Sequence, residues 1–286
     1  MHTTTLFVEQ MTTIDFAYLD AERGLLGESW IVDIELTGKL DNQGMIFDFS
    51  DVKHTLKAWI DQCVDHQLLI PENMSGVHVA TLQEQVTVTA TFGENYQFYH
   101  QSPSRAVCLI PSETITTESV TAFLKKVLVH NLPDNVIDFS LVLRPEAIDG
   151  AYYHYAHGLK KHAGNCQRIA HGHRSRIVIE RNAGRDQALE EKWAKRWQDI
   201  YLITEQDIDA RFAINGEPYY HVAYHAMQGD FVLKLPQAVC ELLPTDSTVE
   251  LIADFIARVL KAQYPNDHIC VKAFEGVHKG AIAVQA

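Results

Sequence analysis

Two histidines in the second half of the chain have the spacing of a metal site. His171 and His173 lie two residues apart in a segment that reads as a strand, so both imidazoles would point to one face and could reach one metal ion such as zinc. Gly172 between them would keep the opposite face uncrowded. The chain holds 15 histidines, so one such pair is also expected by chance, and polar histidines on a sheet are the alternative explanation.

The surroundings of this pair strengthen the metal interpretation. Tyr153-His154-Tyr155-Ala156-His157, then Cys166, then the histidine pair follow one another in a locally basic stretch. Between His157 and Arg185 a single acid, Glu180, is outnumbered by seven cations: Lys160, Lys161, Arg168, Arg174, Arg176, Arg181 and Arg185. A solvated surface is the simpler explanation of such a run, and a binding patch for an anionic ligand is the alternative.

Composition limits the class of protein. Hydrophobic residues make up 47% of the chain and charged residues 21%, which is typical of a folded globular protein. The net charge of -13 argues against nonspecific binding of nucleic acid, because affinity for phosphate backbones comes mainly from Lys and Arg. Without a membrane-length apolar run or a secretion signal, and with five unpaired-looking cysteines, we expect a cytoplasmic protein with reduced thiols and no membrane partner.

The chain contains an internal repeat. Residues 106–137 align with residues 238–269 at a constant offset of 132, and Trp59, Asp65 and Leu68 match Trp193, Asp199 and Leu202 at an offset of 134. A repeat of this length predicts two similar domains, residues 1–150 and residues 151–286.

The pattern of the first half predicts an α+β fold. Residues 30–36 alternate as a strand, and a turn at 39–44 leads into an expected second strand at 45–49. Residues 50–63 and 117–130 have the apolar period of helices, and residues 137–143 read as a closing strand. We therefore expect each half to form an antiparallel sheet with two helices on one face.

These motifs together resemble the 6-pyruvoyltetrahydropterin and 6-carboxytetrahydropterin synthase family. The resemblance implies that His157, His171 and His173 bind Zn²⁺ and that Cys166 is the catalytic thiol, with one coordination position left for substrate. It also implies two tandem tunnelling-fold (T-fold) repeats, each a four-stranded antiparallel sheet with two helices.

The resemblance reaches both ends of the chain. In the first half, residues 44–49 and 64–69 look like the family's Asp-Phe and Asp-His-x-x-Leu signatures, which implies proton transfer by Asp65 and His66. At the C-terminus, Glu275 fits the glutamate that anchors the amino-pyrimidine edge of a pterin, a bidentate interaction that suits a carboxylate.

Each half has lost the motif that the other keeps. The first half reads Leu25-Leu26-Gly27-Glu28-Ser29 where the second has Ala170-His171-Gly172-His173-Arg174, so it cannot bind zinc there. The second half reads Asp199-Ile200 in place of Asp65-His66. This complementary loss predicts a site that lies between a face of the first half and a face of the second.

The resemblance implies a lyase that converts 7,8-dihydroneopterin triphosphate to a 6-substituted tetrahydropterin and releases triphosphate, with Lys160 and Arg168 as candidates for binding the leaving anion. The family places three or five residues between the cysteine and His-Gly-His. Here Cys166 and His171 are separated by four, so the 6-carboxy product of queuosine synthesis and the 6-pyruvoyl product both stay open. We also expect a homo-oligomer, a trimer or its multiple, because single-copy relatives form hexamers.

Two other functions fit the same residues. A tandem protein could bind zinc and a pterin or purine without turnover. Alternatively, a zinc hydrolase could use Glu275 or Asp65 to activate a metal-bound water, which would need no thiol.

Overall fold

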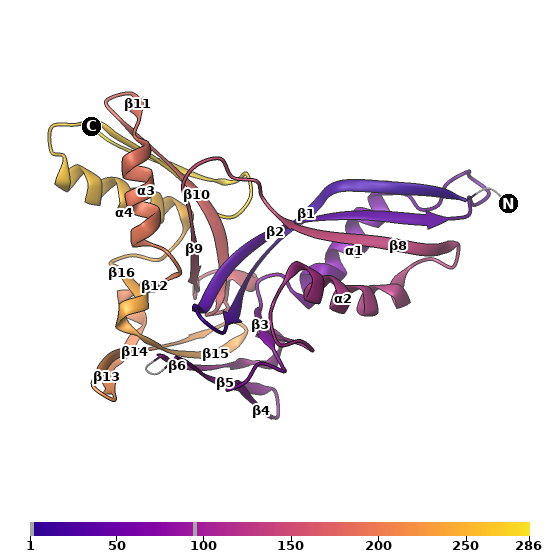
Figure 1. Cartoon of the computed structure of the whole chain (residues 1–286), viewed down its shortest axis with the longest axis horizontal. Helices are drawn as coiled ribbons and strands as arrows, with labels where there is room; N and C mark the ends of the chain where they lie inside the picture. The colour runs from indigo at the N-terminus through magenta and orange to yellow at the C-terminus, as the bar shows by residue number, and fades with distance from the viewer. Residues whose placement is uncertain (1–2, 94–95) are drawn as a thin grey trace.

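The computed structural model describes residues 3–93 and 96–286, which form three β-sheets and four α-helices (Figure 1). The helices are α1 (Phe49–Cys63), α2 (Thr117–Leu128), α3 (Gln187–Arg196) and α4 (Val249–Gln263). The α+β class is as expected. No helix in the described ranges has the length and apolar character to cross a bilayer.

The first half folds around a five-stranded sheet in the order β7-β3-β1-β2-β8. Its strands are β1 (Thr4–Asp20), β2 (Gly24–Gly38), β3 (Leu68–Pro71), β7 (Val107–Ile110) and β8 (Val136–Pro145). Helices α1 and α2 pack on one face, burying Leu56 and Ile60 of α1, Val64 directly after it, and Val120 and Leu124 of α2. The α2 helix starts at a capping box, in which Thr116 accepts a hydrogen bond from the Ser119 amide.

The second half repeats this order in the sheet β16-β12-β9-β10-β17-β18, with the short β11 (Gly184–Arg185) paired to β10. Its other strands are β9 (Tyr152–His157), β10 (His171–Arg181), β12 (Ile200–Thr204), β16 (Cys240–Leu243), β17 (Ile269–Phe274) and β18 (Gly280–Gln285). In the first sheet β3 pairs in parallel with both β1 and β7, and in the second β12 pairs in parallel with both β9 and β16. The long strands β1, β2 and β8, and β9 and β10, pair antiparallel. The expected arrangement is four antiparallel strands in each half. The structure instead has five strands in the first sheet that match five strands of the second, and some of them pair in parallel.

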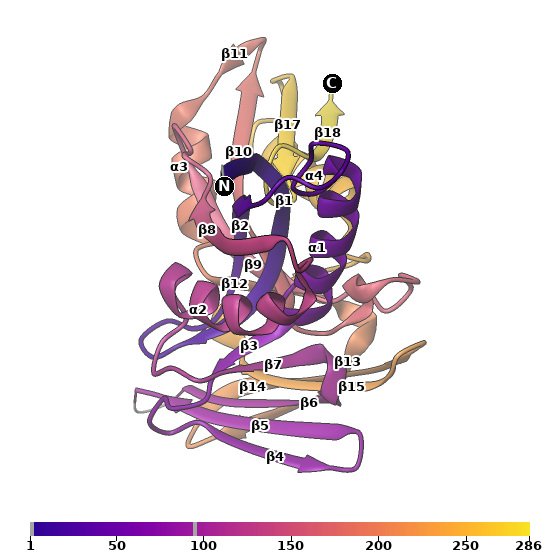
Figure 2. The ribbon, with the colours of Figure 1, turned by 90° about the vertical axis from the view of Figure 1, so that its right-hand side faces the viewer.

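A third sheet joins the two halves (Figure 2). Its order is β13-β14-β15-β6-β5-β4, and β15 pairs with β6, for example Leu233 with His100. The strands are β4 (His78–Leu82), β5 (Gln85–Phe92), β6 (Tyr96–Pro103), β13 (Ile208–Ile214), β14 (Glu217–Ala226) and β15 (Gly229–Pro236). One apolar core beneath it takes side chains from both halves, in addition to the separate core of each half.

The strand registers correct the sequence alignment of the halves by one residue. Ala17 pairs with Leu68 in the first sheet, and Ala156 pairs with Tyr201 in the second, which gives an offset of 133. Under this register Ile60 of α1 corresponds to Trp193 of α3, and both are buried, whereas Trp59 is exposed. A one-residue shift turns a helical side chain by about 100°, so burial distinguishes the two alignments.

The expected strand at 45–49 is absent, because this segment is irregular up to the first residue of α1. The Asn135 side chain donates to the carbonyl oxygens of Lys39 and Ile46, 2.9 Å and 2.6 Å away, and so satisfies backbone groups that a ladder would otherwise pair. The hairpin of the first half lies earlier, between β1 and β2.

The hairpin of β1 and β2 packs against β9 and β10 of the other half, and two glycines permit this close approach. A Cβ on Gly172 would lie 2.6 Å from the Cα of Gly27, and a Cβ on Gly27 would lie 1.8 Å from the carbonyl oxygen of Tyr155. Since any larger residue would push the strands apart, these glycines set the spacing between the halves.

Candidate metal and catalytic site

The three histidines of the second half converge at the end of β9 and the start of β10. His157 and His171 are directly opposite in the antiparallel register, and His173 is two residues further along the same face. All three side chains are buried, and one ligand atom from each lies within 4.8 Å of the others. The arrangement gives three nitrogen donors to one point.

Each imidazole has an oxygen atom close to its Nδ1 atom. His157 Nδ1 lies 3.0 Å from the carbonyl oxygen of Ser247, His171 Nδ1 lies 2.9 Å from that of Arg168, and His173 Nδ1 lies 3.2 Å from Asp15 Oδ1. The Nε2 atoms of His157 and His173 are 3.3 Å apart. Carbonyl acceptors at Nδ1 of His157 and His171 fix the tautomer that presents Nε2 to a metal, and the Asp15 carboxylate lies at ion-pair distance from Nδ1 of His173, so this donor set fits a zinc ion with one open position.

The electrostatic environment favours neutral imidazoles. Burial lowers the pKa of His157 and His171 well below the usual range, and the neighbouring histidines lower both further. Neutral imidazole is the form that ligates metals, so the two side chains would not need to lose protons on binding at neutral pH.

Asp15 of β1 extends the site into the first half. Its carboxylate is buried and accepts hydrogen bonds from the Ser29 hydroxyl and from Lys279 Nζ, the latter at 3.0 Å. Burial opposes ionisation of this carboxyl, but His173, Lys279 and Ser29 outweigh it and hold the pKa of Asp15 below its usual value. The carboxylate is therefore a charged acceptor beside His173.

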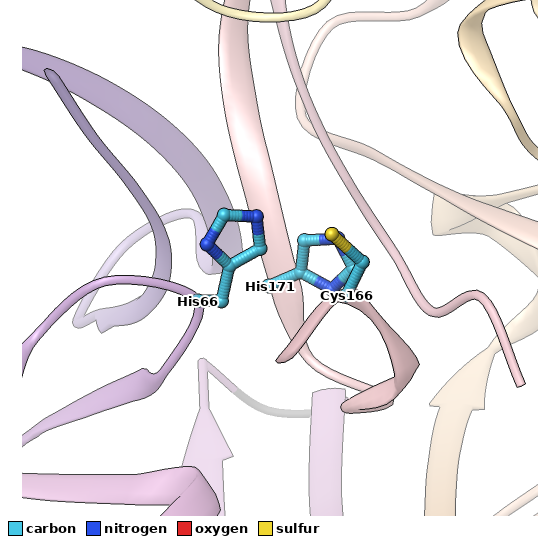
Figure 3. Close-up of side chains that lie close together, drawn as sticks. All are labelled: His66, Cys166 and His171. Atoms are coloured by element: carbon cyan, nitrogen blue, oxygen red, sulfur yellow. The ribbon is translucent and has the colours of Figure 1, made fainter. Parts of the chain in front are cut away.

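Cys166 and His66 lie next to His171, one member of the histidine trio (Figure 3). Ligand atoms of Cys166, His66 and His171 are within 4.8 Å of one another, although His66 comes from the loop before β3 and Cys166 from a 3-10 turn at Asn165–Gln167. His66 has a left-handed backbone with φ of 53°, and its amide donates to the Asp15 carbonyl oxygen at 2.6 Å. A thiol and an imidazole from different halves thus face each other.

Asp65 orients His66. Its Oδ2 lies 2.7 Å from His66 Nδ1, and its Oδ1 accepts the Asp15 amide at 2.8 Å. Burial alone would lower the pKa of His66, but hydrogen bonds with Asp65 and Cys166 raise it to about 10. His66 is therefore a protonated side chain in contact with a thiol at neutral pH, an arrangement suited to moving protons.

The three residues expected to bind substrate differ in their surroundings. Glu275 lies between β17 and β18, and its Oε1 is 3.9 Å from His173 Nε2, so it borders the trio. Lys160 forms an ion pair with Asp207. Arg168 is buried and donates to the His66 carbonyl oxygen at 3.3 Å, next to the thiol.

The equivalent place in the first half carries different residues. In the β1-β2 register, Tyr18, Leu26 and Glu28 occupy the positions of His157, His171 and His173. The counterpart of His66 under the corrected register is Asp199, which also has a positive φ of 58° and forms an ion pair with Arg23. The first half therefore lacks the three histidine donors at these positions. The ion pair of Asp199 with Arg23 lies where His66 would be.

Sequence reasoning missed Asp15 and Lys279. Asp15 corresponds to His154 of the second half, and that histidine lies 3.8 Å from Glu28, the counterpart of His173. The acid and the histidine have thus exchanged places between the two pseudo-equivalent pairs. This exchange would have been a detectable signal once the β1-β2 and β9-β10 hairpins were aligned.

Comparison with known families agrees with the resemblance. The sequence of residues 15–140 matches the family model described as 6-pyruvoyl tetrahydropterin synthase. Residues 15–140 are a domain of this family. The matched range includes Asp15, Asp65 and His66, and the chain is about twice its length, which is consistent with a tandem duplication in this tetrahydropterin synthase family.

Solved structures similar to the chain carry the same family name. A 6-pyruvoyl tetrahydropterin synthase from Plasmodium vivax is 18% identical, with a TM-score of 0.38, and the match covers 50% of this chain and 99% of that one. The Plasmodium falciparum protein of that name is 15% identical, with a TM-score of 0.38 and coverage of 50% and 98%. No curated protein matches the sequence.

Proposed function

We propose that the protein is a zinc-dependent lyase that converts 7,8-dihydroneopterin triphosphate to a 6-substituted tetrahydropterin and releases triphosphate. The observation that carries this proposal is the meeting of His66 with Cys166 beside the histidine trio. A metal site alone would fit many functions, but a thiol and an oriented imidazole at its edge provide two groups for proton transfer.

The roles of the residues follow from their contacts. His157, His171 and His173 would hold Zn²⁺, which when bound polarises substrate oxygens and acidifies the adjacent C-H. Cys166 would remove a proton from the substrate side chain, and His66 would return one. Asp65 would keep the His66 ring in place through its Nδ1 atom.

Glu275 would orient the pterin. Its carboxylate lies at the edge of the trio, where it can accept two parallel N-H donors from an amino-pyrimidine ring. Lys279, which lies in the same β17–β18 loop and donates to Asp15, adds a cation at this edge.

Two further features belong to this proposal. Residues 1–150 would supply the Asp-His pair, and residues 151–286 would supply the zinc ligands, thiol and glutamate. The strands β8 and β18 are the outer strands of their sheets and expose Val142 and Ile282, which favours association of chains edge to edge as a cytoplasmic trimer or its multiple.

The deciding experiment is turnover of 7,8-dihydroneopterin triphosphate by the purified protein, with products identified by mass and bound zinc measured in parallel. The mass of the product would also show whether the protein catalyses the 6-carboxy or the 6-pyruvoyl reaction of the family. Cys166→Ala should keep zinc and pterin binding and lose turnover. Pterin binding with no turnover by the unaltered chain would instead favour a binding protein, and full turnover by Cys166→Ala would favour a zinc hydrolase.

A further inference from the structure

A cavity of about 700 Å³ lies beside the candidate site and is lined by both halves. Asn165 and Arg168, which flank Cys166, line it from the second half, and Arg105 lines it from the first. Gln67, the neighbour of His66, also contributes. Sequence neighbours of the thiol and the imidazole thus line the cavity, whereas Cys166, His66 and the three proposed zinc ligands do not.

Two guanidinium groups are anchored in this cavity on one residue, Gln228. Arg168 Nε donates to Gln228 Oε1 at 3.0 Å, and an Arg105 amino group donates to the Gln228 carbonyl oxygen at 2.9 Å. Gln228 is held in turn, because its side-chain amide donates to Asn165 Oδ1 at 2.8 Å and its backbone amide to Gln167 Oε1 at 2.6 Å. The two cations are therefore placed on the same side of the cavity by a common support.

The hydrogen bonds found for these two guanidiniums in the described ranges all end on neutral acceptors, namely Gln228 and the His66 carbonyl oxygen. Arg168 is only 6% exposed. Burial and the nearby Arg105 lower the pKa of Arg168 to about 10, and the attraction of Asp65 and Cys166 offsets this only in part. Arg105 is exposed and screened by water, so the cost of an unpaired charge falls mainly on the buried Arg168, and an anion beside it would reduce that cost.

The other charges nearby are already balanced. Asp61 also lines the cavity, but it forms an ion pair with Lys57 one helical turn earlier. Lys160 and Lys161, the remaining cations of the loop before Cys166, are paired with Asp207 and Asp246. The unbalanced positive charge of this region is thus concentrated on Arg105 and Arg168.

We propose that Arg105 and Arg168 bind a phosphate group in this cavity. Planar guanidiniums offer paired N-H donors that match phosphate oxygens. The two guanidiniums that donate to Gln228 can therefore bind neighbouring oxygens of a phosphate chain. The site has one cation from each half, so it needs the assembled chain. The binding site stands independently of the proposed reaction.

The test is calorimetric titration of the zinc-loaded full chain with inorganic triphosphate as its magnesium complex, with protein-bound zinc measured before and after. Arg105→Gln should weaken binding about tenfold or more, and Arg105→Lys should restore part of the affinity. Arg211→Gln is the matched control, because Arg211 is an exposed arginine on β13 outside the cavity, and it should bind like the unaltered chain. Lack of binding by the unaltered chain, or equal affinity in Arg105→Gln, would overturn the proposal.

A second arm identifies the source of the phosphate and rests on the proposed function. If the site holds the tail of the substrate, Arg105→Gln raises KM for 7,8-dihydroneopterin triphosphate, and inorganic triphosphate inhibits competitively. If it holds a separate phosphate, KM is unchanged and inhibition is noncompetitive; both results support the site. Triphosphate binding that depends on Arg105 in a protein without turnover would support the site while refuting the proposed reaction.

Discussion

Asp15 Oδ1 lies 3.2 Å from His173 Nδ1, although the two residues belong to different halves of the chain. A carboxylate at this position raises the basicity of a metal-binding imidazole and fixes its ring. We expect Asp15→Asn to weaken zinc binding by roughly 10- to 100-fold, as measured by competition with a chelator of known affinity.

Glu28→Gln provides the matched control for Asp15→Asn. Glu28 makes the pseudo-equivalent approach to His154, at 3.8 Å, in the place that lacks the histidine trio. This variant should leave zinc affinity unchanged. Equal affinities of Asp15→Asn and the unaltered chain would mean that the carboxylate does not support the metal site.

Asp65→Asn should lower the pKa of His66. The bond to the Asp65 carboxylate favours the charged imidazolium and helps to raise the pKa to about 10, so its loss makes the ring release its proton at lower pH. The titration of His66 can be followed by NMR without reference to turnover. Asp209→Asn, beside the distant His221, should leave that titration unaffected, and a His66 that titrates at the same pH in Asp65→Asn would contradict this account.

Chains that carry His66→Ala and chains that carry Cys166→Ala should not restore each other's activity when they are expressed together. Both side chains of a site come from one chain in the structure, so every chain in a mixed oligomer would contain one broken site. Turnover of 7,8-dihydroneopterin triphosphate by the purified mixed oligomer checks this. Substantial recovery would show that sites form across chain boundaries.

Acid should destabilise the protein partly through His100. Burial lowers the pKa of this side chain to about 3, so between pH 6.5 and pH 3 the unfolded chain binds a proton that the folded chain does not. Stability is therefore lost as pH falls through this window, by up to about 1.4 kcal/mol per pH unit. In His100→Leu the pH dependence of the urea midpoint should be shallower by that contribution.

His225 serves as the comparison for His100, because it is an exposed histidine paired with Asp230. His225→Gln should keep the acid sensitivity of the unaltered chain. A His100→Leu curve parallel to the original would show that His100 is not buried in its neutral form.

The sequence predicts the grouping of the histidines but not the residues that support them. His157, His171 and His173 lie on adjacent strands, so local spacing and strand period bring them together. Asp15 approaches His173 through the packing of two hairpins from opposite halves, and no local period contains that information.

The errors in the predicted fold have a similar origin. A gapless alignment matched Trp59 with Trp193, yet burial shows that Ile60 is the counterpart, because only three-dimensional packing selects which face of a helix is inside. The pairing of β6 with β15 is also invisible in the pattern, since any exposed strand edge could accept a partner.

The sheet that β6 and β15 complete has a consequence for how the protein behaves at low concentration. This sheet joins the half that carries His66 to the half that carries Cys166 through backbone hydrogen bonds and one shared core. The local concentration of each group around the other is therefore set by the fold of one chain. Specific activity should therefore persist on dilution, even below the concentration at which separate chains part.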